Sequence, residues 1–102
     1  MTMTTWKYKL EMVDAQDIDI VKGGKILCVA NQCGKVVIYV FVDQDETRRE
    51  RMRVFIAGTG HPRDDIDGTK YIGTLLFHGG AEVYHFFVER KAKLFTEGEN
   101  EE

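Results

Sequence analysis

The sequence predicts an all-β protein, folded as a compact antiparallel sandwich or barrel of about six to seven strands. Three observations indicate this class: apolar and polar residues alternate in short runs, glycine and acidic turns separate the runs, and no segment shows a clear helical period. The chain has 102 residues, 43% of them hydrophobic, which suits a single core. We therefore expect one β domain over residues 1–95, followed by an acidic, disordered tail, "TEGENEE", over 96–102.

The expected strands follow from this alternation and from the turn residues between them. In the first strand, the apolar side chains from Trp6 to Leu10 fall on one face and lysines on the other. The stretch "NQCG" (31–34) is a hairpin signature, with Gly34 available for positive φ. Residues 36–42 are apolar on both faces, which predicts either a central strand covered on both sides or a subunit interface. The expected strands are 6–12, 17–22, 25–32, 35–42, 51–58, 71–77 and 82–95.

Composition limits the classes of partner. The formal net charge is −3, so the basic excess typical of proteins that bind polymeric nucleic acid is missing. The two cysteines are too few for a secreted disulfide scaffold, and the N-terminal residues lack the apolar centre of a signal peptide. No apolar run approaches the ~20 residues of a membrane span. We expect a cytoplasmic protein with no membrane partner.

The stretch "GTGHPRDD" (58–65) brings together glycines, a histidine, the sole proline and charged residues. It opens a 12-residue segment, 59–70, that lacks an apolar period, and such long loops in small domains are usually functional or disordered. Gly58 and Gly60 allow positive φ and exposed N–H groups, Thr59 adds a hydroxyl, and His61 adds a donor that titrates near neutral pH. The stretch predicts either an anion-binding platform or a strand-ending turn fixed by its proline.

Four other residues are candidates for the same ligand. Arg53 and Arg63 each carry a planar fork that matches a phosphate group. Tyr71 and Tyr84 offer rings for stacking on a base, an interaction of about 1–3 kcal/mol. Arg53 and its neighbour Arg51 have an alternative, which is cross-strand pairing with acidic residues.

Familiar catalytic and metal-binding motifs are missing from the sequence. There is no serine and no P-loop, and the aspartates near Gly68 do not have the spacing of an EF-hand. The three histidines, His61, His78 and His85, show no zinc-ligand spacing. His85 is expected to be a hydrogen-bonded core histidine, and Cys28 is also expected in the core. We predict no catalytic residue, no metal and no cofactor.

The order of several motifs resembles a family of small, mostly phage-encoded proteins. These motifs are "GTGHP" (58–62), "YIGT" (71–74) and "HGGAEVYHFF" (78–87), preceded by "KY" (7–8) and "ILCV" (26–29). More loosely, the chain is similar to viral sponges, including the anti-CBASS proteins that hold cyclic dinucleotides. This similarity implies a non-enzymatic homo-oligomer, a dimer or tetramer, in the host-cell cytoplasm, with pockets at or near subunit interfaces.

Motifs and resemblance together predict a protein that sequesters a small nucleotide second messenger, such as cGAMP, without hydrolysing it. Such a protein would block host anti-phage signalling such as CBASS. One alternative is a protein–protein inhibitor or virion accessory protein that uses residues 58–70 and 43–53 as contact surfaces. A second alternative is a small metal-dependent hydrolase that uses His61 or His85 with Asp64 or Asp65. The expected ligand-binding residues are Arg53, Gly58, Thr59, Gly60, His61, Arg63, Tyr71 and Tyr84.

Overall fold

The computed structural model describes the backbone of residues 1–96 and the side chains of residues 1–90. Its strands are β1 (Met3–Lys9), β2 (Ala15–Val21), β3 (Lys25–Gln32), β4 (Lys35–Asp43), β5 (Arg48–Gly58), β6 (Lys70–Phe77) and β7 (Glu82–Thr96). Two short 3-10 turns, η1 (Asp64–Ile66) and η2 (His78–Gly80), precede β6 and β7. Apart from Thr96, which ends β7, the predicted acidic tail lies outside the described residues.

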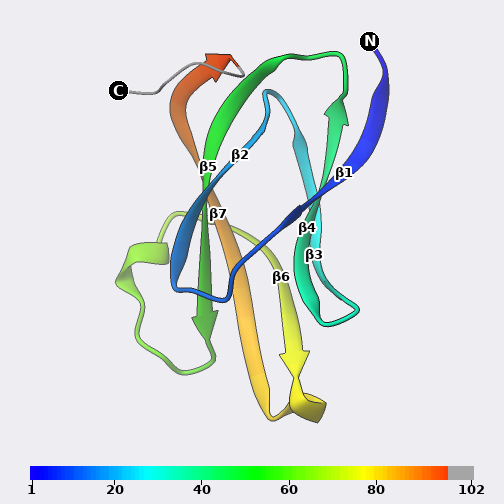
Figure 1. The fold of residues 1–102 in the computed structure, drawn as a ribbon. Helices are drawn as coiled ribbons and strands as arrows, with labels where there is room; N and C mark the ends of the chain where they lie inside the picture. The colour runs from blue at the N-terminus through cyan, green and yellow to red at the C-terminus, as the bar shows by residue number, and fades with distance from the viewer. Residues whose placement is uncertain (97–102) are drawn as a thin grey trace.

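The strands form two antiparallel sheets, so the predicted all-β class is confirmed in its sandwich form (Figure 1). One sheet has three strands in the order β1-β4-β3, and the other has four in the order β2-β5-β7-β6. The connections after β1, β2 and β4 each pass from one sheet to the other, whereas β5, β6 and β7 stay in the same sheet. The chain therefore crosses between the two sheets three times, which links them covalently.

The core lies between the sheets, where strand alternation directs the apolar side chains inward. On β4 these are the side chains of Val36, Ile38, Val40 and Val42, and on β5 they include Met52 and Val54. Phe86 of β7 is fully buried, and other apolar side chains of the cluster surround it. The inward residues are mainly β-branched, as suits a pleated, half-buried surface.

β4 is central in its sheet, but its outward face is only partly covered. Val37 on that face is buried, whereas Phe41 is 39% exposed. Of the two interpretations of the apolar run 36–42, covering on both sides is therefore not found within the described residues. A subunit interface on this face stays a prediction.

The β3–β4 hairpin closes with the two-residue loop Cys33-Gly34, in which both residues have positive φ, at 53° and 83°. This is the backbone of a type I′ turn, whose twist matches that of the strands, so the predicted hairpin is confirmed. The prediction that Cys28 lies in the core is wrong, because its side chain is exposed. A register shift between Ile26 and Cys28 pairs Cys28 with Tyr39, on the outward face of the sheet.

Residues 59–69 form a crossover rather than a hairpin loop. β5 and β6 both pair antiparallel with β7, so they are parallel to each other, and their connection must cross β7. Because the inward face of the sheet packs on the other sheet, the crossover passes over the outward face. The side chains of Phe55 and Ala57, which alternate outward on β5, are both buried.

Candidate functional site

The end of β5 and the start of β7 enclose a polar surface hollow of about 330 Å³. A second hollow of about 290 Å³ adjoins it and shares the walls formed by Gly58, His61 and Tyr84. The first is otherwise lined by Thr59, Ala81, Glu82 and Val83, and the second by Met12, Val13, Asp14 and Ile56. Four of the eight predicted ligand residues, Gly58, Thr59, His61 and Tyr84, therefore line this pair of hollows.

Backbone hydrogen bonds fix the shape of the "GTGH" turn. Gly58 pairs with Tyr84 at the end of the β5–β7 ladder, and the Thr59 N–H donates to the Val83 carbonyl at 3.1 Å. The His61 N–H then turns back to the Gly58 carbonyl at 3.2 Å. A Cβ on Gly58 would lie 2.9 Å from Nδ1 of His61, so glycine lets the imidazole fold against the strand end.

These bonds limit the amides available to a ligand. Gly60 has φ of 84°, and within the described part of the chain its N–H has no protein acceptor. The amides of Thr59 and His61 are already used inside the turn. Within residues 59–61, the predicted cradle of several amides is thus reduced to the Gly60 amide, supplemented by the side chains of Thr59 and His61.

A chain of hydrogen bonds joins the turn to β6 across β7. Thr59 Oγ1 lies 2.7 Å from Nε2 of His85, and His85 Nδ1 lies 2.9 Å from Oγ1 of Thr74. Thr74 Oγ1 is in turn 2.5 Å from the hydroxyl of Tyr71. His85 is hydrogen-bonded, as expected, but the prediction that it is a core residue is wrong. It is half-buried and points outward, opposite the inward-facing Phe86.

Sequence reasoning did not place Thr74 in this chain. The residue faces His85 because Thr74 and His85 are register partners, and the β6–β7 register shifts between Tyr71 and Gly73. A strand bulge of this kind leaves no clear mark in the alternation of residues. The one available signal was the threonine beside Gly73 in an otherwise apolar strand.

The two candidate tyrosines lie on opposite faces of the four-stranded sheet. Tyr84 packs against the core and meets the ring of Phe77 edge-on at 5.7 Å. Tyr71 is 54% exposed and meets Phe87 edge-on at 5.7 Å, on the outward face. Tyr84 therefore contributes to the hollows, while Tyr71 reaches Thr59 only through the hydrogen-bonded chain.

Both candidate arginines are engaged by protein groups. Nε and Nη2 of Arg53 donate to the carboxylate of Asp17 at 2.8 and 3.2 Å, which confirms the alternative of cross-strand pairing. The hydrogen bonds that Arg53 donates to this carboxylate raise the pKa of Arg53. Arg53 also lies five residues before Gly58, roughly 16 Å along an extended strand.

Arg63 holds the crossover against the sheet. It donates to the Ile56 carbonyl at 2.7 Å, to the Asp14 carbonyl at 3.1 Å, and twice to the Asp65 carboxylate at 2.9 Å. The hydrogen bonds from Arg63 lower the pKa of Asp65. The Arg63 side chain is 15% exposed, and its geometry is that of a loop anchor.

Across the described residues, no three His, Cys, Asp or Glu side chains gather in a way that suits a metal ion. The part of the chain that the structure describes also includes no helix long and apolar enough to cross a membrane.

The molecule is thus a two-sheet antiparallel β-sandwich domain with paired polar hollows at one end of its four-stranded sheet. A family model described as "Domain of unknown function (DUF7352)" matches residues 1–95, and the chain belongs to this family. No curated protein and no solved structure matches the chain at a significant level.

Proposed function

We propose that this protein is a non-enzymatic binding protein that sequesters a small nucleotide, of the cyclic dinucleotide class, in the paired hollows beside Gly58–His61. Sequestration of such a signal would block host anti-phage signalling such as CBASS. The observation that carries the proposal is the pair of adjoining hollows, about 330 and 290 Å³, that share the walls of Gly58, His61 and Tyr84. Each is close to the lower end of the ~300–1,000 Å³ range of small-molecule sites.

Two similar hollows with a shared wall suit a ligand with two similar halves. One nucleotide unit would enter each hollow, and the ring of His61 would lie between the units. The Gly60 N–H, the Thr59 hydroxyl and the His61 imidazole would donate to one of the two phosphodiester linkages. Tyr84 would contact one base through the part of its ring that faces the hollow.

The charges around the hollow favour phosphodiesters over terminal phosphates. Arg53 and Arg63 bind carboxylates of the protein, and Glu82, which lines the first hollow, accepts a hydrogen bond from His78 at 2.9 Å. Among the described residues near the hollows, neither arginine is free of a carboxylate partner. A terminal phosphate, which carries two negative charges, would therefore find no unpaired arginine to bind. A phosphodiester carries one charge and can be held by neutral donors.

Calorimetry with a panel of cyclic dinucleotides and ADP-ribose derivatives tests this function. We expect at least one cyclic dinucleotide to bind at micromolar protein concentration and to be recovered intact after the complex is heated. No heat of binding from any member of the panel would overturn the proposal. Recovery of a hydrolysed product would instead support the hydrolase alternative.

Gly60→Val is the sharpest variant, because a matched control exists in the same crossover. Gly60 and Gly68 both have φ of 84°, and at each of them a Cβ would have no neighbouring atom within 4 Å. Valine strains the backbone similarly at both places, but only Gly60 lies between two residues that line a hollow, Thr59 and His61. We expect Gly60→Val to abolish binding, Thr59→Ala to weaken it less, and Gly68→Val to retain it. Equal losses in the two glycine variants would contradict the assigned site.

We also propose that the protein is a homo-oligomer, a dimer or tetramer. Support comes from the end of the outward β4 face around Phe41, which is 39% exposed, and from Leu27 on β3, which is 50% exposed. Apolar side chains on an open sheet face are often covered by a partner. Sedimentation equilibrium should give a mass that is a multiple of the 11.7 kDa chain, and a monomer at all concentrations would refute this point.

A further inference from the structure

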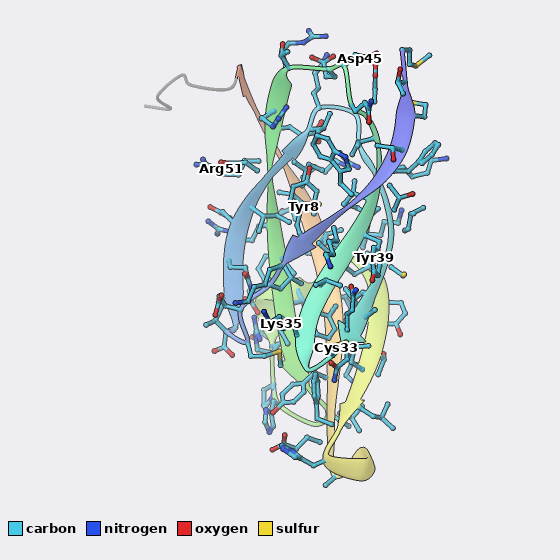
Figure 2. The ribbon with its side chains drawn as sticks, turned by 45° about the vertical axis from the view of Figure 1, so that its right-hand side comes forward. Tyr8, Cys33, Lys35, Tyr39, Asp45 and Arg51 are labelled. Atoms are coloured by element: carbon cyan, nitrogen blue, oxygen red, sulfur yellow. The ribbon has the colours of Figure 1, made fainter. Side chains whose placement is uncertain are left out.

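A separate hollow, of about 410 Å³, lies on the outward face of the three-stranded sheet, away from the site described above. Its walls are Lys7, Lys9, Lys35, Gln32 and Cys33, and Val37 forms its floor. Figure 2 shows Cys33 and Lys35 near each other at the tip of the β3–β4 hairpin, with Tyr39 further along the same sheet. The hollow is therefore bordered by three lysine side chains on a protein whose formal net charge is −3.

Strand register explains why these lysines share one face. Lys7 pairs with Tyr39 and Lys9 pairs with Val37, while Lys35 pairs with Gln32 on the other side of β4. Register partners in an antiparallel pair project to the same face, and residues two apart on a strand do as well. Val37 and its register partner Ala30 have shorter side chains than their neighbours on this face. The hollow lies above this short pair.

The lysines have few counter-charges among the residues that the structure describes. Glu11 Oε2 lies 3.9 Å from Nζ of Lys9, and both side chains are largely exposed, at 72% and 61%. An exposed pair at this distance is weak and screened by salt. Lys7 donates to Gln32 at 3.5 Å, and no carboxylate of residues 1–90 lies within ion-pair distance of Lys7 or Lys35.

Gln32 adds a neutral donor to this wall. Its Oε1 accepts hydrogen bonds from the Tyr39 hydroxyl at 2.7 Å and from Lys7, which can only donate. The amide oxygen is therefore held toward these two groups, and the NH₂ group is left to donate to a ligand. Val37, which is 4% exposed, offers apolar contact beneath.

We propose that this lysine hollow, formed by Lys7, Lys9, Gln32, Cys33, Lys35 and Val37, binds a small organic phosphate. The phosphate would lie among the three ammonium groups and the Gln32 amide, and the carbon body would lie against Val37 and the stems of the lysines. The ligand is small because the hollow is bounded and its positive charge is confined to three residues. This site is independent of the function proposed for the Gly58–His61 hollows.

The test is a titration of isotope-labelled protein with phenyl phosphate, followed by amide NMR shifts. We expect the shifts to centre on Cys33, Gly34 and Lys35 and to fade as salt is added. Lys7→Gln and Lys35→Gln should each weaken binding by about tenfold, which is the loss of one hydrogen bond to a charged group. Lys25→Gln, on the same face but at the far end of β3, is the control and should leave affinity unchanged.

Further ligands distinguish the possible occupants. Inorganic phosphate should bind more weakly than phenyl phosphate, because it makes no contact with Val37. Equal affinity for the two would refute the role of the apolar floor. No shift at 33–35 with about 10 mM phenyl phosphate, a concentration that detects even millimolar affinity, would overturn the proposal. Tight binding of an oligonucleotide without binding of phenyl phosphate would also overturn it.

Discussion

At the scale of single residues, the neighbours of each arginine decide what that arginine does. Arg53 projects from β5 beside Asp17, its register partner on β2, so its fork binds a carboxylate on the sheet surface. Arg63 has the same chemistry, but its nitrogen atoms reach two main-chain carbonyls as well as Asp65. In the sequence, Arg53 and Arg63 are equally good candidates for binding a phosphate. Only strand register and the path of the crossover distinguish a surface pair from a loop anchor.

Arg63→Ala should destabilise the protein by about 2 kcal/mol, because the carbonyls of Ile56 and Asp14 lose a charged donor. Urea unfolding measures this change. Arg53→Ala is the matched control, and its effect should be too small to resolve, since it removes an exposed pair. If both variants lost the same stability, Arg63 would not be the anchor described here.

Stability should also depend on pH through Asp65. The hydrogen bonds from Arg63 hold the pKa of Asp65 below its ordinary value in the folded state. Its contribution is therefore complete above the unfolded pKa of about 3.9 and is lost as pH falls through the folded value. The difference in unfolding free energy between the natural protein and Asp65→Asn should be constant above about pH 5 and shrink below about pH 4. A difference that does not vary with pH would refute this assignment.

At the scale of elements, an ion pair between the buried Glu50 and the partly exposed Arg90 joins β5, β7 and the turn between β2 and β3. The side chain of Glu50 is 10% exposed, binds Nη1 of Arg90 and accepts a hydrogen bond from the Gly23 N–H at 2.9 Å. Nη2 of Arg90 donates to the Gly24 carbonyl. The pair thus closes the end of the sandwich where the chain passes from one sheet to the other.

Glu50→Ala should cost about 1–3 kcal/mol, because it leaves the Gly23 amide without its acceptor and removes the partner of Arg90, whose side chain is 42% exposed. Urea unfolding of Glu50→Ala, Arg90→Ala and the double variant gives the coupling between the two residues. We expect the double variant to lose clearly less than the sum of the single losses. Additive losses would show that the pair does not act as a unit.

The sequence was sufficient to predict the strands, but not the register with which neighbouring strands pair. Alternation located all seven strands, although β1 lies at residues 3–9 rather than 6–12 and β5 begins at Arg48 rather than Arg51. Cys33-Gly34 identified the hairpin, because turn chemistry is also a local signal. The hydrogen-bonded chain through Thr74 and His85 depends on register across a bulge, which is a long-range property. For the same reason, Tyr71 and Tyr84 could be named as candidates, but not assigned to opposite faces.

At the scale of the whole molecule, the two sheets carry different chemistry on their outward surfaces. The four-stranded sheet pairs its arginines with acidic residues, as in Arg53 with Asp17, and ends in polar hollows that, among the described residues, no unpaired arginine lines. The three-stranded sheet gathers three lysines around a hollow with an apolar floor. A single small sandwich can therefore offer two separate binding surfaces. The paired hollows would bind a cyclic dinucleotide, and the lysine hollow would bind a small organic phosphate.

Amide NMR shifts on titration with cGAMP test the central claim most directly, because they show where on the molecule the ligand binds. The account predicts that the largest shifts occur at Gly60, His61 and Tyr84, around the paired hollows, and that they disappear in Gly60→Val but persist in Gly68→Val. Shifts confined to Cys33–Lys35, or no shifts at all, would contradict the claim that Gly58–His61 form the nucleotide site.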